Sequence, residues 1–170
     1  VDSIVVGNFV GKEALAAVGS VGPICNSLIG FFMGLSTGAG VVISQYYGAK
    51  EHQKMSRTVS TTFLMTLVLS ILFTILGIFM TPYMLRMMST PEDVIRQSDT
   101  YLRIYFAGAS GLMFYNMGSG ILRAVGDSRH PLYFLIFSAC VNTVLDLVFV
   151  ICFGMGIEGV ALATILAQFF

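Results

Sequence analysis

Long uncharged stretches alternate with short polar segments along the whole chain. Residues 14–49, 58–85 and 104–122 contain no Asp, Glu, Lys or Arg. Each stretch is long enough to cross the hydrocarbon core of a bilayer, which takes about 20 apolar residues in a helix. The pattern predicts an all-α polytopic membrane protein, with helices over 1–10, 14–47, 58–85, 101–122, 132–153 and 159–170.

The polar segments between these helices predict an orientation. Successive loops alternate between the two sides of the membrane, so the loops 48–57 and 123–130 lie on the same side. They carry five of the Lys and Arg residues. The opposite side, which includes 86–103, carries four. The positive-inside rule therefore assigns 48–57 and 123–130 to the cytoplasm of a multi-pass protein in the cell (inner or plasma) membrane.

The amino-acid composition excludes further classes of protein function. Of 170 residues, 56% are hydrophobic and 11% are charged, and the net charge is zero, so nothing favours a nucleic-acid partner. The three cysteines lie in apolar stretches without the spacing of metal ligands or of a disulfide framework. The chain opens without Met and stops inside an apolar run, so we expect a piece of a longer protein, truncated at both ends.

One carboxylate lies inside an apolar segment. Asp146 is the only charged residue between Arg129 and Glu158, and a charge at the centre of a membrane helix costs roughly 3 kcal/mol. Asn142 precedes it by one helical turn and shares its helix face. The pair can bind a proton or Na⁺, or it can be a structural polar contact between helices.

A second acid, Asp2, matches Asp146 in depth. Asp2 lies ten residues before Lys12, and Asp146 lies twelve before Glu158, on helices that run toward the same side. At about 1.5 Å per residue both lie roughly 15–18 Å below one surface. Two nearby carboxylates in a medium of low dielectric constant disfavour double ionisation, which favours a cation or proton site. Intramembrane aspartyl proteolysis also needs two acids, but neither acid has the flanking residues of that chemistry.

Other polar residues in the predicted helices are candidates to line a cavity. Asn26, Tyr115 and Asn116 are three of them. Equally, such side chains can hydrogen-bond to a local carbonyl or across helices.

Several short segments resemble one transporter family in their order and spacing. They are VDSIVVG at 1–7, ALAAVG at 14–19, GLS at 34–36, QYYGAK at 45–50, LRAVGD at 122–127, the segment 142–146, and GMGIEGVALAT at 154–164. Together they resemble the multidrug and toxic compound extrusion (MATE) transporters of the prokaryotic type.

The resemblance implies twelve helices in two six-helix lobes around a central cleft. This chain would form the amino-terminal lobe, from late helix one to early helix six, with the carboxy-terminal lobe as its partner. It implies exchange of H⁺ or Na⁺ for organic cations by alternating access, with no other cofactor or metal and no enzymatic activity. The coupling site would comprise Asp2, Asn142, Asp146 and Thr164, and Thr164 enters only through the resemblance.

Two other functions stay open at this point. A related lipid-precursor flippase would share the helices and the cleft, but it would need basic side chains within the cavity. A non-transporting subunit of a membrane assembly would use the acids only to hold helices together.

Overall fold

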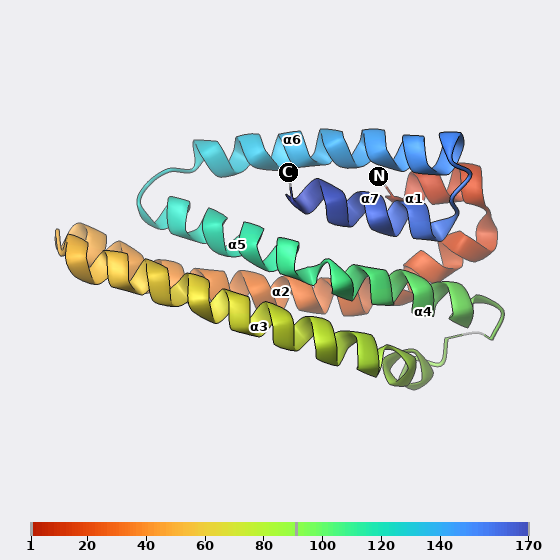
Figure 1. Ribbon diagram of the computed structural model, residues 1–170, viewed down its shortest axis with the longest axis horizontal. Coiled ribbons are helices and arrows are strands. Elements are labelled where there is room, and N and C mark those ends of the chain that lie inside the picture. The colour runs from red at the N-terminus through yellow and green to blue at the C-terminus, as the bar shows by residue number, and fades with distance from the viewer. Residues whose placement is uncertain (1, 91, 170) are drawn as a thin grey trace.

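A computed structural model describes residues 2–90 and 92–169, except for the side chains of Asp2, Ser3 and Asp93. Every regular element in this part is a helix, and the helices run along one long axis (Figure 1). In chain order they are α1 (Asp2–Val5), η1 (Val6–Val10), α2 (Lys12–Gly48), α3 (His52–Met87), α4 (Glu92–Ala107), α5 (Ala109–Ala124), α6 (Arg129–Leu147), η2 (Val148–Cys152) and α7 (Ile157–Phe169), where η marks π-helical turns. The all-α prediction is confirmed.

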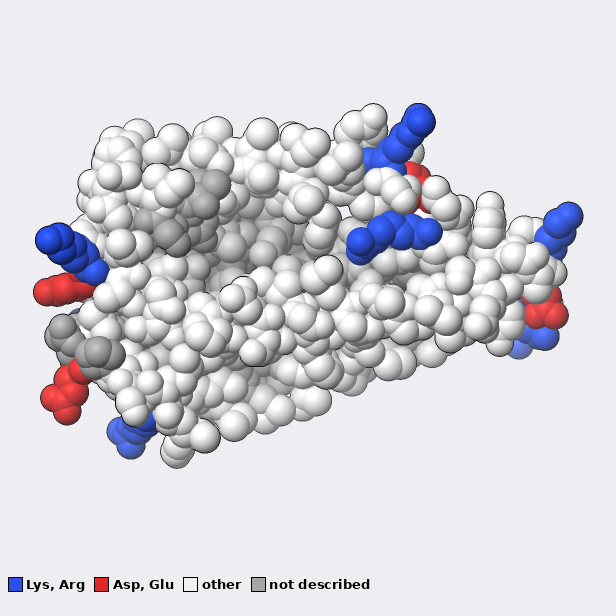
Figure 2. Space-filling model, turned by 180° about the vertical axis from the view of Figure 1, so that it is seen from behind, with Lys and Arg blue, Asp and Glu red and all other residues white. Residues whose placement is uncertain are grey.

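Among the described residues, three helical segments are long and apolar enough to cross a membrane: α2, α3, and α6 together with η2. They contain 37, 36 and 24 residues, and about 20 suffice. Figure 2 shows most charged side chains toward the two ends of the molecule, with a largely uncharged surface between them. The chain is therefore a helical membrane protein whose apolar belt faces the bilayer.

The turns between helices lie at opposite ends of the bundle. The turn between α2 and α3 and the turn between α5 and α6 lie at one end (Figure 1). The connections from α3 to α4 and from η2 to α7 lie at the other end. This arrangement agrees with the parity of the predicted loops, while the assignment of 48–57 and 123–130 to the cytoplasm stays a prediction.

The predicted helix 101–122 is not one helix in the structure. The helical run begins at Glu92 and breaks at Gly108, between α4 and α5. A Cβ atom at Gly108 would overlap the Ile165 side chain of α7, so the glycine lets α7 approach the break closely. Sequence periodicity does not show such a break, because the cause is a contact with a helix that follows much later.

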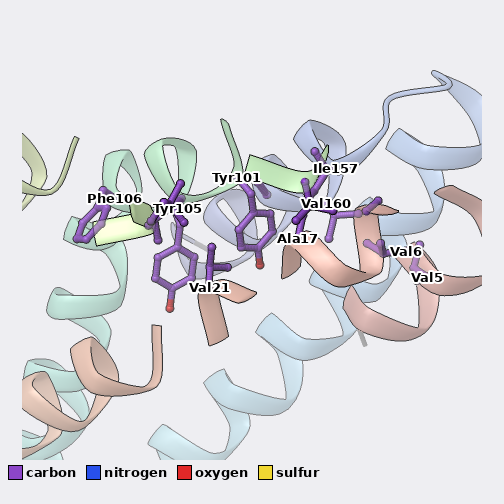
Figure 3. Packing of buried hydrophobic residues seen from close by; sticks show 14 of the residues in the cluster. Val5, Val6, Ala17, Val21, Tyr101, Tyr105, Phe106, Ile157 and Val160 are labelled. Carbon is purple, nitrogen blue, oxygen red and sulfur yellow. The ribbon is translucent and has the colours of Figure 1, made fainter. Parts of the chain in front are cut away.

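A buried apolar cluster lies where α4 meets α2 and α7. Figure 3 shows Tyr101, Tyr105 and Phe106 of α4 among Val21 of α2 and Val160 of α7. The two tyrosine rings are stacked, with centroids 6.4 Å apart. This packing fixes α7, and with it one wall of the candidate site, against the rest of the bundle.

Asp127 holds the start of α6 in the turn outside the membrane. Its Oδ1 accepts hydrogen bonds from the backbone N–H groups of Arg129 (3.1 Å) and His130 (3.2 Å). The hydrogen bond from the His130 backbone is the main cause that lowers the pKa of Asp127 from its usual 3.8. The charged carboxylate therefore stabilises the fold above about pH 4, and this contribution disappears as the pH falls through the lowered pKa.

We expect Asp127→Ala to lower the thermal midpoint of the detergent-purified full-length protein slightly at pH 7, because the two N–H groups lose their acceptor. The difference from the wild type should shrink as the pH falls below 3.8. Asp127→Asn keeps an acceptor oxygen and should lose less. A midpoint difference that does not change with pH would contradict the role of the carboxylate charge.

Candidate functional site

One face of α6 carries three polar side chains at intervals of four residues: Ser138, Asn142 and Asp146. This spacing stacks them on one helix face. The face lies against α7, since Ser138 Oγ donates a hydrogen bond of 2.5 Å to the backbone oxygen of Ala167. Ser138 was not among the predicted site residues, although the same spacing, extended one turn back from Asn142, points to it.

The structure brings Asn142 and Thr164 together. The Asn142 amide Nδ2 donates to Thr164 Oγ1 over 3.4 Å, and Thr164 Oγ1 donates to the backbone oxygen of Val160 over 3.0 Å. The hydroxyl proton of Thr164 is thus directed to its own helix, and its oxygen lone pairs face α6. Both side chains are half-buried. The contact between α6 and α7 therefore includes two polar side chains, Asn142 and Thr164.

Asp146 lies one turn beyond this contact and is completely buried, with 0% of its surface exposed. It is the only Asp, Glu, Lys or Arg among the buried residues of the described part. An ionised carboxylate in such a position is expensive unless a cation or a proton neutralises it. Complete burial makes Asp146 the candidate in the described part for a proton-binding or cation-binding role, which stays a prediction.

The fourth predicted residue, Asp2, has its side chain outside the described part. Its backbone belongs to α1, which packs against α6. The helices of the two acids are therefore neighbours, while the pairing of the two carboxylates stays a prediction.

Both helices that carry an acid change from α-helical to π-helical form shortly after it. The change occurs at Val6 on the first helix and at Val148 on the later one. The two π segments, η1 and η2, contact each other. Such segments occur frequently at functional sites because they disturb the regular ladder of hydrogen bonds. The sequence carries no signal that predicts them.

The three other candidate residues lie apart from this cluster. Asn116 is buried, and its amide donates to the Leu112 backbone oxygen over 2.8 Å. The Tyr115 hydroxyl donates to the Pro131 backbone oxygen over 3.3 Å, and Asn26 is exposed on α2. These hydrogen bonds are of the local and interhelical kinds expected for structural residues, and a role in lining a cavity stays a prediction.

Polar side chains with oxygen atoms lie on both α6 and α7. In the described part, no group of three or more His, Cys, Asp or Glu residues could hold a metal ion. Asn142, Asp146 and Thr164 each offer a side-chain oxygen, from two packed membrane helices. In secondary transporters, the sites for coupling ions lie near the bilayer midplane.

Comparison with known proteins gives one consistent family. The family model described as MatE matches residues 1–148. The chain is 38% identical to the "Probable multidrug resistance protein YpnP" of Bacillus subtilis over 99% of its length, and 37% identical to the "Probable multidrug resistance protein YoeA" of the same organism over 98%. A crystal structure of a MATE protein in a bent conformation superposes with a TM-score of 0.94, at 30% identity over 98% of this chain.

The chain spans little more than a third of these proteins. It covers 38% of the YpnP sequence, 37% of the YoeA sequence and 37% of the solved structure. The similarity therefore concerns one part of a larger architecture.

Proposed function

Because the chain belongs to the multidrug and toxic compound extrusion (MATE) family, whose members are transporters and not enzymes, we propose that it is the amino-terminal lobe of an antiporter. The antiporter exchanges H⁺ or Na⁺ for organic cations across the cell membrane by alternating access. The relatives named as multidrug resistance proteins support the substrate class. The observation that carries the proposal is the complete burial of Asp146 one helical turn from Asn142, which itself contacts Thr164.

The coupling site consists of Asp2, Asn142, Asp146 and Thr164. Entry of H⁺ or Na⁺ neutralises the buried charge of Asp146, and this allows α6, α7 and the first helix to repack. A coupling ion can drive such a change only if its affinity differs between the outward-facing and inward-facing states. The π segments η1 and η2 lie where these helices meet, so they are placed to absorb the rearrangement.

A lipid-precursor flippase is less well supported. It would hold an anionic headgroup with basic side chains inside the cavity. On the face shown in Figure 2, most Lys and Arg side chains lie toward the ends of the molecule, and one lies further in, near the hollow in its middle. The buried acid of this lobe, Asp146, suits a cationic substrate better than an anionic one.

Transport by the full-length protein in liposomes tests this function. A fluorescent organic cation should move against its gradient when an opposing Na⁺ or pH gradient is imposed, each applied separately. We expect one of the two gradients to drive transport and its collapse by an ionophore to stop it. Failure of both gradients to drive any organic cation, with protein that is folded and inserted, would contradict the proposal.

A further inference from the structure

A cavity of about 530 Å³ lies between α2, α3 and α5. Its volume falls within the range of sites for small molecules, roughly 300–1,000 Å³. The lining comes from Gly34 and Gly38 on α2, Thr61 and Met65 on α3, and Met117 on α5, among others. The candidate coupling residues do not belong to it, so it is a separate feature of the molecule.

The cavity has apolar walls and one charged residue. Arg57 lines it near the start of α3, and its side chain is exposed. In the described part of the chain the Arg57 guanidinium has no ion-pair partner. The neighbouring Lys54, by contrast, pairs with Glu51 at 2.8 Å. Arg57 therefore offers unused hydrogen-bond donors at the mouth of an apolar space.

The apolar space continues along α3 toward the centre of the membrane. A second hollow, of about 270 Å³, shares Thr61 and Met65 with the first and extends to Val68 and Leu69. Twelve residues separate Arg57 from Leu69, a distance of roughly 18 Å along a helix. The hydrocarbon core of a bilayer is about 30 Å thick. The two hollows together form one groove. It begins at the charged end of the molecule and has about the depth of one leaflet.

We propose that this groove binds an anionic phospholipid, with its phosphate at Arg57 and one acyl chain that passes between α2, α3 and α5 and then continues along the surface of α3. Arginine is suited to phosphate because its planar guanidinium makes two parallel hydrogen bonds. Basic pockets between membrane helices bind anionic headgroups by the same chemistry. The single positive charge disfavours an organic cation in this cavity, so the groove is distinct from the export path. The depth and apolar lining match an acyl chain.

Native mass spectrometry of the purified full-length protein tests the site, with phosphatidylglycerol and phosphatidylcholine as probes of equal chain length. Arg57→Gln should weaken phosphatidylglycerol binding about fivefold, the effect of one basic residue near anionic lipid, and should remove the preference over phosphatidylcholine. Arg129→Gln is the matched control, because Arg129 is exposed at the same end and lies outside the groove. It should leave the preference unchanged.

A second pair of variants tests the acyl chain. A Cβ atom added at Gly38 meets no atom within 4 Å, and Gly38 lines the cavity, so Gly38→Leu should reduce the space there and lower retention of both lipids. Gly30→Leu is the control, because Gly30 lies two turns earlier, also has open space around an added Cβ atom, and does not line the cavity. The Gly30→Leu protein should retain both lipids. Equal losses for Arg57→Gln and Arg129→Gln would mean diffuse attraction to the surface and would overturn the proposal. So would wild-type binding by both Arg57→Gln and Gly38→Leu, the result expected if another part of the chain fills the groove.

Discussion

Replacement of Asp146 by asparagine is expected to reduce coupled efflux by the full-length protein to the background of cells without the transporter. An amide has nearly the shape of the carboxylate, but it cannot carry the negative charge or exchange a proton. The thermal midpoint of the purified variant should be unchanged or higher. Burying an ionisable group is unfavourable, and a neutral group of the same shape often fits such a position at least as well.

This combination of results separates a coupling site from a structural contact. If Asp146 only holds helices together, the variant should lose stability along with activity, and rescue of folding should restore efflux. Ser138→Ala is a suitable control, because it removes one hydrogen bond between α6 and α7 on the same face and leaves the acid in place. It should lower stability modestly, by about 1 kcal/mol, and keep most of the efflux. Wild-type efflux by Asp146→Asn would contradict the coupling role.

Gly77→Ala is expected to destabilise the protein, although alanine is the better helix former by about 1 kcal/mol. A Cβ atom at Gly77 would overlap the ring of Phe106, which is 1% exposed in the contact between α3 and α4. The Thr74 hydroxyl also donates to the Phe106 backbone oxygen over 3.2 Å, so the backbones of α3 and α4 are held together at this point. Overpacking of this kind typically costs about 1–3 kcal/mol. The thermal midpoint in detergent measures the net effect, which should be a decrease.

Gly118→Ala on α5 is the matched control, since an added Cβ meets nothing within 4 Å there. Its midpoint should stay the same or rise. The double variant Gly77→Ala, Phe106→Leu should recover part of the loss, because the smaller side chain leaves room for the methyl group. A midpoint for Gly77→Ala at or above that of the wild type would show that α3 and α4 are not packed as described.

The helices and their order could be predicted from the sequence because apolar runs and short polar turns dominate it. The placement of Asn142 and Asp146 on one face followed from their spacing alone, and the structure adds that this face meets α7. The break at Gly108 and the π segments could not be predicted, since each depends on contacts between distant segments. Thr164 could be proposed only from a family resemblance, because its role depends on a partner, Asn142, on another helix.

The central claim is that Asp2 and Asp146 act as one coupling site. Efflux of a fluorescent organic cation, measured for the full-length wild type, Asp2→Asn, Asp146→Asn and the double variant at equal membrane levels, tests it most directly. Residues that act as a unit are strongly non-additive, so each single variant should lose coupled efflux and the double variant should be no worse than either. Wild-type efflux by both single variants, or losses that multiply in the double variant, would contradict a shared site.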